Sequence, residues 1–329
     1  MKNEKQIAGL KKKIDQALLP LIDDDYSLLD VPNYNNIGDS LIYEGELALL
    51  KNVPHKRKFS GCRKFVRLKD IPEKGIILMQ GGGNFGDLWR VFQEFRLNII
   101  KNRVEQKIII FPQTVHYQHK ENLLNDAAIF NLHPNLTICA RDQTSYEILK
   151  EYFYNNQILL VPDMAFYLDL TRFISSESTD KVLLLQRVDK ELKNRDDILE
   201  DKLTSGDTLK TLVQSDWPGI EYTKAEKRKW KRKVKMNKYY TRALLFLGKS
   251  PQKLNLDFGE LNLFESSMQL EKGVAFINQF DAIYSTRLHG AILSILLGKP
   301  VYILDNSYGK NSSFYNCWLQ DFEDCEMLD

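Results

Sequence analysis

Residues 281–304 constrain the fold more than any other stretch of the chain. Residues 281–286 read as a buried strand, residues 291–297 as an apolar helix, and residues 301–304 as the next strand. A glycine and then a proline separate the helix from the second strand, as expected where a helix stops. This spacing predicts a compact β-turn-α-β unit of an open α/β sheet, whose ligands bind beyond the carboxyl ends of the strands.

The turn of this unit carries Arg287, Leu288, His289 and Gly290 at the start of the predicted helix. A helix N-terminus offers free N–H groups and the positive end of a dipole, which favour an anion. Arg287 adds a fixed cation and His289 a side chain that titrates near neutrality. The turn is therefore a candidate anion site, although it could equally be a structural turn whose Arg and His cap neighbouring carbonyls.

Strands and helices alternate on both sides of a polar stretch at residues 171–180. Alternation from residue 26 to residue 167 predicts a doubly wound parallel sheet, and a second alternating block opens with a strand at residues 181–186. A length of 329 residues is consistent with two domains. The expected division is an N-terminal Rossmann-like domain (1–172), a C-terminal Rossmann-like domain (173–310) and a tail (311–329) that packs back as a helix.

The first predicted strand (26–31) runs into a polar loop and then a helix near residues 41–51. Asn36 or Asp39 can cap that helix. The loop after the first strand is also where α/β proteins place ligand contacts, so capping and binding are both open for these two residues.

A glycine-rich turn follows the predicted strand 76–80. Gly81, Gly83 and Gly86 satisfy G-x-G-x-x-G between a strand and a helix, the pattern that binds dinucleotides. The next strand, residues 107–111, ends without the carboxylate that would hold the ribose, so no nicotinamide or flavin cofactor is expected. The glycines are instead expected to let the backbone approach a ligand or the other domain closely.

Other residues limit the class of protein. His116, His119 and His133 have no Cys or acid at ligand spacing, so no metal site is expected. The four cysteines form no C-x-x-C pair, no signal peptide begins at Met1, and no apolar run reaches the length of a membrane span. The expected location is the cytoplasm, with peripheral contact to the inner face of the membrane.

Two basic features lie in the second block. Arg187 follows the strand at residues 181–186 and repeats the position of Arg287, which makes the two arginines a candidate anion clamp or simply surface charge. Residues 224–238 hold nine basic side chains around Trp230, in a chain of net charge +2. Such a run is either a solvated helix face or a patch that binds anionic membrane; nucleic-acid binding is not expected.

Six short motifs occur in order along the chain: Asn36-Ile37-Gly38-Asp39, Gly81-Gly82-Gly83-Asn84-Phe85-Gly86-Asp87, Phe111-Pro112-Gln113, Ala140-Arg141-Asp142, Pro162-Asp163 and Ser285-Thr286-Arg287-Leu288-His289-Gly290. Together they resemble the polysaccharide pyruvyl transferase family. The resemblance implies two Rossmann-like domains arranged as in GT-B glycosyltransferases, with the site in the cleft between them. It also implies transfer of a pyruvyl group from phosphoenolpyruvate to two hydroxyls of a sugar, without a metal or cofactor.

By this resemblance the donor is held by Arg287 and His289, with Leu288 and Gly290 of the same motif, and by Arg187. A basic insertion after Arg187 departs from the family pattern. The acceptor, expected to be a sugar on a polyprenyl diphosphate, would meet Asn36, Asp39, Gly83 and Asn84.

The chemistry of phosphoenolpyruvate fits these residue types. Its carboxylate and phosphate call for arginines and a helix N-terminus. His289 is suited to be the general acid that protonates C3, and Asp39 is the candidate base. Two alternatives remain: a GT-B glycosyltransferase that uses a sugar nucleotide, and a non-catalytic scaffold at a site of polysaccharide assembly.

Overall fold

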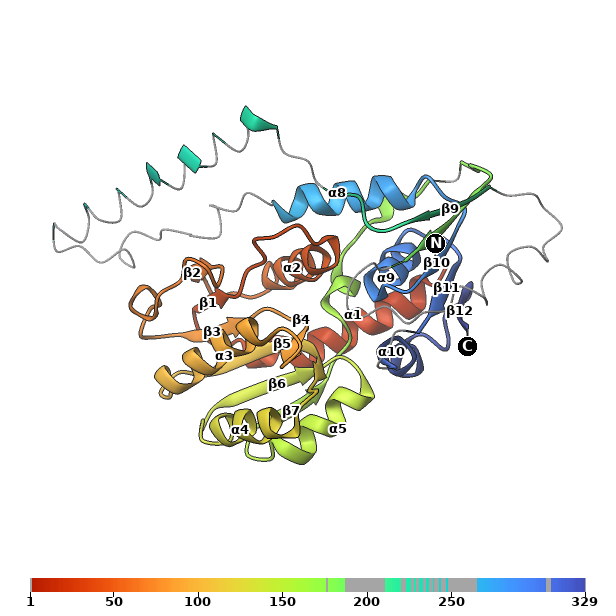
Figure 1. Cartoon of the computed structure of the whole chain (residues 1–329). Helices are drawn as coiled ribbons and strands as arrows, with labels where there is room; N and C mark the ends of the chain where they lie inside the picture. Colours follow the sequence, from red (N-terminus) through yellow and green to blue (C-terminus); the bar gives the residue numbers. More distant parts are fainter. Residues whose placement is uncertain are drawn as a thin grey trace.

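The computed structural model describes residues 2–175, 177–186, 211–219, 265–305 and 309–328, and single positions or pairs and triplets between 223 and 247 (223–225, 228, 231–232, 235–236, 239, 243 and 247). Within these residues the chain forms two parallel β-sheets flanked by helices (Figure 1). A mixed α/β fold with parallel, Rossmann-like sheets was expected from the alternation of apolar strands and helices, and it is confirmed.

The first sheet, counted over the described residues, has seven strands in the order β2-β1-β3-β5-β6-β7, with β4 paired to β5. All of its pairings are parallel. Its strands are β1 (Tyr26–Leu29), β2 (Arg57–Gly61), β3 (Ile76–Met79), β4 (Gly82–Gly86), β5 (Ile108–His116), β6 (Leu136–Ala140) and β7 (Gln157–Leu160). Its helices are α2 (Ile37–Leu50), α3 (Arg90–Asn102), α4 (Lys120–Phe130) and α5 (Gln143–Tyr152). The order reverses between β1 and β3, where an open α/β sheet offers a ligand crevice.

The second sheet has five parallel strands among the described residues, in the order β12-β11-β10-β8-β9. Its strands are β8 (Lys181–Leu185), β9 (Thr211–Ser215), β10 (Ala282–Ser285), β11 (Val301–Leu304) and β12 (Cys325–Leu328). The helices are α8 (Ser266–Ile277), α9 (Leu288–Leu296) and α10 (Lys310–Trp318). The β10-α9-β11 unit is the one predicted from residues 281–304.

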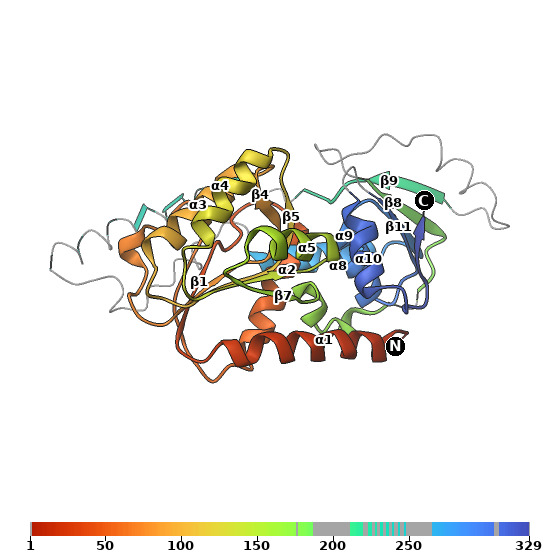
Figure 2. The ribbon, with the colours of Figure 1, turned by 90° about the horizontal axis from the view of Figure 1, so that it is seen from below.

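Helix α1 (Glu4–Leu18) lies beneath both sheets (Figure 2). Its apolar stripe is buried, with Ile14 and Leu18 at 0% exposure, and it belongs to one hydrophobic cluster that includes side chains from both sheets. The start of the helix is tied to the far end of the chain, because Gln6 Nε2 donates to the backbone carbonyl of Asp321 at 3.1 Å. This helix therefore links the two halves of the molecule.

Short 3-10 turns complete the connections: η1 (Leu19–Leu21), η2 (Leu68–Asp70), η3 (Met164–Tyr167) and η4 (Thr171–Phe173). The boundary expected at residues 172–173 falls at η4, between the last strand of the first sheet and the first strand of the second. The division of the chain into separate domains stays a prediction, since α1 and the shared cluster connect the two sheets.

The expected helical tail is wrong in part. Only Lys310–Trp318 is helical, and Cys325–Leu328 forms β12, which pairs in parallel with β11. The backbone N–H of Val301 donates to the carbonyl of Asp324 at 2.8 Å, so the tail completes the edge of the second sheet. Leu328 is buried there, so the tail does pack back, but its last part does so as a strand.

The glycine-rich stretch was expected to be a turn, but residues 82–86 form β4 beside β5. A Cβ at Gly81 would lie 2.7 Å from the carbonyl oxygen of Pro112, and one at Gly86 only 1.9 Å from that of His116. These two glycines therefore allow the backbone to approach β5, and not a ligand or the other domain.

In the part of the chain that the structure describes, no helix combines the length and apolar character needed to cross a membrane.

Candidate active site

A cavity of about 520 Å³ lies between the carboxyl ends of the two sheets. One wall comes from the segments after β1, β2 and β3, with Arg141 after β6; the other comes from the segments after β9 and β10 and from α10. It therefore sits at the reversal of strand order in the first sheet, as open α/β sheets predict. Of the residues expected at the site from the sequence, the cavity is lined by Asn36, Asp39, Gly83, Asn84, Arg287, Leu288 and His289.

Gly290, also expected at the site, is not among the residues that line the cavity. Gly290 lies in the core of α9: a Cβ there would be 2.4 Å from Leu185 Cδ2 and 2.5 Å from Ser285 Oγ, so its role is close packing on β8 and β10. Arg187 lies outside the described residues, and its part in binding the donor stays a prediction.

The loop before α2 brings an acid into the cavity. Asn36 is the N-cap of α2, and its Oδ1 accepts a hydrogen bond from the backbone N–H of Asp39 at 3.3 Å. The helix consequently begins four residues earlier than predicted. Asp39 Oδ2 accepts from Tyr34 Oη at 2.7 Å and from Asn36 Nδ2 at 2.8 Å. Burial, the charge of Asp39 and that of Asp30 raise the pKa of Tyr34 well above its usual range.

Arg287 is the N-cap residue of α9 and lines the cavity. Its Nε and Nη2 donate to the two carboxylate oxygens of Asp216, which follows β9. The two side chains are 16% and 20% exposed. The bidentate pair fixes the plane of the guanidinium, because a fork-shaped donor matches a carboxylate in one orientation.

His289, in the first turn of α9, packs against the first turn of α2. A Cβ on Gly38 would lie 2.6 Å from His289 Nδ1, so only glycine lets the imidazole sit at this depth. On the other side, His289 Nε2 lies 3.4 Å from Asp163 Oδ2 and is buried. The ring is thus held between the two halves of the molecule.

Asp163, which follows β7, also accepts from Arg141 Nη1 at 2.6 Å, and both side chains are 1% exposed. Arg141 Nε donates in turn to Thr114 Oγ1 at 2.8 Å. Burial by itself would raise the pKa of Asp163, but the charges of His289 and Arg141 and their hydrogen bonds hold it well below its usual range. Asp163 is therefore an ionised carboxylate beneath the imidazole.

Gly83 separates two cations at the floor of the cavity. A Cβ on this residue would lie 3.1 Å from Arg141 Nη2 and also 3.1 Å from Lys310 Nζ, so a side chain here would crowd both. Arg141, Lys310, Arg287 and His289 all line the cavity. An anion in this corner would meet cationic groups from both halves of the chain.

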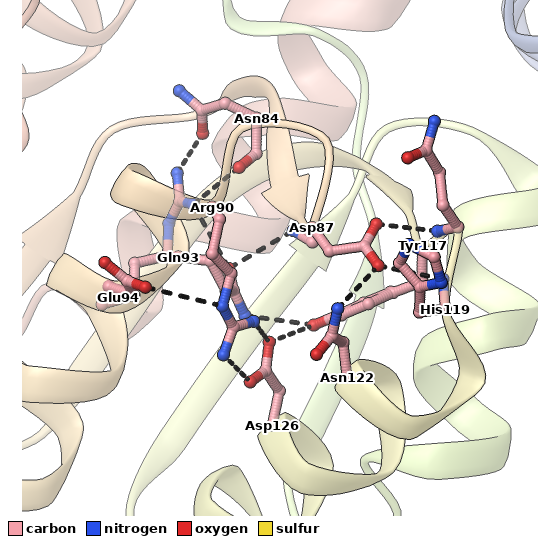
Figure 3. Close-up of polar contacts among 12 residues, drawn as sticks. Asn84, Asp87, Arg90, Gln93, Glu94, Tyr117, His119, Asn122 and Asp126 are labelled. Carbon is pink, nitrogen blue, oxygen red and sulfur yellow. Dashed lines mark hydrogen bonds and ion pairs between the residues drawn. The ribbon is translucent and has the colours of Figure 1, made fainter.

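The position of Asn84 is fixed by hydrogen bonds from a buried arginine. Arg96 is fully buried; its Nη2 donates to Asn84 Oδ1, and its Nη1 donates to the Asn84 backbone carbonyl at 3.1 Å. The carbonyl oxygen of the Asn84 side chain is therefore already used, and its amide nitrogen points away from this network (Figure 3). Asn84 can offer the cavity a hydrogen-bond donor, which a sugar hydroxyl or a phosphate oxygen could accept.

The last residue of the glycine-rich motif has a structural role. Asp87 accepts from the backbone N–H groups of Gln118 and His119 at 2.7 and 2.9 Å and from Asn122 Nδ2 at 3.0 Å (Figure 3). Burial opposes ionisation of Asp87, but these hydrogen bonds lower its pKa. The motif thus ties β4 to the start of α4.

Aromatic side chains border the rest of the cavity. The Arg63 guanidinium lies 4.6 Å from the centre of the Phe92 ring, and Phe92 meets Tyr34 edge-on at 5.8 Å. Trp89 is 38% exposed at this edge, and Trp217 lies on the opposite wall. Flat apolar rings beside hydrogen-bonding groups form a surface suited to a sugar ring.

Sequence reasoning missed Arg141, Asp163, Asp216 and Lys310 as site residues. The first two could have been found, because each lies just beyond a predicted strand and within a motif already noted. Asp216 follows β9, a strand that the sequence reading did not predict, and Lys310 lies in a helix far from the turn at Arg287. Arg63 was missed because β2 was missed.

The three histidines considered for metal binding are not brought together. His133 is buried, and its Nε2 lies 3.2 Å from the carbonyl oxygen of Arg103. Burial lowers the pKa of His133, although the hydrogen bond to that carbonyl acts in the opposite direction. His119 contributes its backbone N–H to Asp87. Across the described residues, no group of three or more His, Cys, Asp or Glu side chains is arranged to hold a metal ion.

Comparison with known proteins shows the family to which this chain is related. The sequence model of the polysaccharide pyruvyl transferases matches residues 36–308. A protein of Bacillus subtilis (strain 168) named "Putative pyruvyl transferase EpsO" is 31% identical over 334 aligned positions, which cover 100% of this chain and 96% of the relative. The "Pyruvyl transferase 1" of Schizosaccharomyces pombe is 28% identical, in an alignment that covers 89% of this chain and 69% of the relative.

A solved structure shares the fold. The crystal structure of an uncharacterised protein from Klebsiella pneumoniae subsp. pneumoniae NTUH-K2044 matches with a TM-score of 0.60 at 20% identity, covering 97% of this chain and 98% of the other. From the family match over most of the sequence and the full-length relative, the chain belongs to the polysaccharide pyruvyl transferase family and is a transferase.

Proposed function

We propose that the cavity transfers a pyruvyl group from phosphoenolpyruvate to two hydroxyls of a sugar, giving a cyclic ketal and inorganic phosphate. The observation that carries this proposal is the corner formed by Arg141, Arg287, His289 and Lys310, which converge from both halves of the chain on one cavity. A donor with a carboxylate and a phosphate needs several fixed cations at short range. The family membership supports pyruvyl transfer to a polysaccharide acceptor.

On the donor side, the cations have different surroundings. Arg141 is buried and paired with Asp163, and Arg287 is paired with Asp216. Both pairs hold the guanidinium in place, so that its remaining N–H groups are presented without reorganisation. Arg187 is proposed as a further donor ligand because it follows β8, the neighbour of β10 in the second sheet.

On the acceptor side, Asp39, Asn36 and Asn84 supply polar groups and Trp89 and Phe92 supply flat faces. We assign Asp39 as the base that takes the proton of the attacking hydroxyl. Its Oδ2 accepts two hydrogen bonds, from Tyr34 and Asn36, which fix the orientation of the carboxylate.

The reaction then proceeds in two additions. The first hydroxyl oxygen attacks C2 of the donor while His289 delivers a proton to C3, which becomes the methyl group, and Asp39 takes the hydroxyl proton. The C2–O bond to phosphate breaks, and phosphate leaves with the electron pair and the proton held by Asp39. The second hydroxyl attacks C2 and closes the ketal, and its proton restores the imidazolium of His289.

Three finer points extend the proposal. The two halves are proposed to be arranged as in GT-B enzymes, since the carboxyl ends of both sheets border the cavity. The acceptor is proposed to be a repeat unit of a surface polysaccharide on a polyprenyl diphosphate, and residues 224–238 to attach the enzyme to the inner face of an anionic membrane. In that segment the described basic residues Lys224, Arg228, Lys231, Arg232 and Lys235 are all exposed.

The test is phosphate release from phosphoenolpyruvate, measured with the full chain against a panel of lipid-linked and nucleotide-linked sugars. We expect release only when a suitable acceptor is present. Thermal shift with phosphoenolpyruvate, UDP-sugars and GDP-sugars provides the comparison with glycosyl transfer. Stabilisation by a sugar nucleotide donor and none by phosphoenolpyruvate would overturn the proposal in favour of a glycosyltransferase.

A further inference from the structure

A buried carboxylate lies directly behind the ring of His289 and comes from the other half of the chain. Asp163 follows β7 of the first sheet, whereas His289 belongs to α9 beside the second sheet. Their closest approach, Asp163 Oδ2 to His289 Nε2, is 3.4 Å, and Asp163 is 1% exposed. A carboxylate at this depth requires charged or hydrogen-bonded partners.

The two ring nitrogens of His289 have different surroundings. Nε2 is buried on the side of Asp163. Nδ1 lies against Gly38, which lines the cavity together with His289 itself. We propose that Asp163 is a positioning residue for His289, holding Nε2 and so leaving Nδ1 as the nitrogen that exchanges protons with the substrate.

The surroundings of Asp163 are consistent with this role. Its other oxygen, Oδ1, accepts from the backbone N–H of Ala165 at 2.9 Å, and Arg141 Nη1 shares Oδ2 at 2.6 Å. The carboxylate therefore cannot rotate without losing these two hydrogen bonds. A carboxylate held in this way selects the ring orientation and stabilises the imidazolium form of a neighbouring histidine.

Other charged groups surround the pair. Arg141 is paired with Asp163, Arg287 is paired with Asp216, and Lys310 and Asp39 line the same cavity. Glu46 on α2 is buried, which raises its pKa well above the usual range. Among the described ion pairs, Asp163 is the acid paired with the imidazole, whereas Asp216 is paired with Arg287.

The inference rests on the proposed role of His289 as general acid, but its first test does not depend on activity. The chain has five histidines, so their ring resonances can be followed separately by NMR. In Asp163→Asn the ring resonances of His289 should move and the proton on Nε2 should lose its protection from exchange, because the charged group beside Nε2 is lost. The ring resonances of the other four histidines should stay where they are.

A matched control is Asp142→Asn. Asp142 is also a buried acid just beyond a strand, and it caps α5 through Ser145 N at 2.8 Å, but no contact joins it to His289 among the described hydrogen bonds and ion pairs. Its substitution should leave the ring resonances of His289 unchanged. An equal change in both variants would show that any loss of buried charge in this region is sufficient, and would overturn the specific role of Asp163.

A second measurement uses the wild-type protein and does not require the variant to fold. The proton on Nε2 should give an exchange-protected resonance, whereas the proton on Nδ1 should exchange rapidly. Protection of Nδ1 in place of Nε2 would overturn the assignment.

Kinetics separates this inference from the proposed function. Asp163→Asn should reduce kcat more than it raises KM for phosphoenolpyruvate. If the wild type has no pyruvyl transferase activity but the NMR shifts occur, the proposed function fails while the coupling of the two residues stands. If activity exists and neither the change in the His289 resonances nor the fall in kcat occurs, the positioning role is wrong.

Discussion

At the scale of single residues, the site combines one imidazole with several fixed cations. His289 is held between Gly38 and Asp163, and Arg287 is held by Asp216. In the motif at residues 287–290, Arg287 and His289 line the cavity, and Leu288 is buried but also borders it. Gly290 faces away from the cavity and packs on β8 and β10. This arrangement explains how an Arg and a His two positions apart line the same cavity from one helix start.

The first prediction concerns proton delivery by His289. His289→Gln should reduce turnover by about 10²–10⁴, the range for the loss of a general acid, because glutamine donates a hydrogen bond but does not supply a proton at neutral pH. Binding of phosphoenolpyruvate, measured by calorimetry, should stay within a few-fold of the wild type. Turnover near the wild-type rate in this variant would mean that the proton comes from another group.

The second prediction concerns Arg287. Arg287→Ala should weaken phosphoenolpyruvate binding roughly thirtyfold, because a charge-assisted contact to an anion contributes on the order of 2 kcal/mol. Arg287→Lys keeps the charge but loses the bidentate contact with Asp216, so it should recover only part of the affinity. The same loss is predicted for Arg187→Ala. Unchanged donor affinity in either alanine variant would remove that arginine from the donor site.

At the scale of helices and strands, much of the fold could be predicted because burial leaves a clear pattern. Strands were predicted at residues 26–31, 76–80 and 181–186, and β1, β3 and β8 begin where predicted because apolar runs mark them. The β10-α9-β11 unit was predicted for the same reason. Strand β2, with an exposed and charged first half, and strand β9, with no buried residue, lack that pattern and were not predicted.

The residues of the site could be predicted where they follow a strand that was itself predicted. Residues in turns directly after predicted strands, such as Asn36, Asp39 and His289, were placed at the cavity from the sequence. Asp163 was visible as part of a motif, but its contact with His289 depends on how the two sheets face each other, which no local pattern encodes. Asp216 was missed because its strand was missed. The assignments of donor and acceptor ligands stay predictions.

The third prediction tests the packing of α9 on α2. In Gly38→Ala the new methyl group would lie 2.6 Å from His289 Nδ1, so the ring or the helix must shift. Activity should fall between about tenfold and 10²-fold, because a misplacement of about 1 Å in a catalytic group can cost roughly 10²-fold in rate. Thermal unfolding should also occur at a lower temperature.

Gly9→Ala is the matched control for this substitution. Gly9 lies on the exposed face of α1, and a Cβ there meets nothing within 4 Å. Alanine should stabilise that helix by up to about 1 kcal/mol and leave activity unchanged. If Gly38→Ala behaves like Gly9→Ala in both measurements, the close contact with His289 is not needed for activity.

At the scale of the whole molecule, the site is shared between two sheets that are held together. Helix α1 lies beneath both, and Gln269 of α8 accepts from the backbone N–H of Asn36 at 2.9 Å beside the cavity. Trp318 Nε1 of α10 donates to the carbonyl of Arg141 at 2.7 Å. These contacts join both halves at the positions where their loops form the cavity, so neither half contains a complete site.

The fourth prediction concerns attachment to a membrane. Residues 224–238 hold nine basic side chains in a chain of net charge +2, so binding to anionic vesicles should be strong at low salt. It should disappear near 1 M salt, where screening shortens to about 3 Å. Co-sedimentation with vesicles is the measurement, and replacement of Lys231, Arg232 and Lys235 by Gln should weaken it. Binding that does not respond to salt would contradict an electrostatic patch.

The central claim is that this cavity forms a pyruvate ketal from phosphoenolpyruvate. The most direct measurement is mass spectrometry of a sugar acceptor after incubation with the full chain and carbon-13-labelled phosphoenolpyruvate, with His289→Gln alongside. We predict that the acceptor gains one labelled pyruvate with loss of one water, in step with phosphate release, and that the variant forms this product at a greatly reduced rate. An acceptor that gains a sugar from a nucleotide donor, and never a labelled three-carbon unit, would contradict the account.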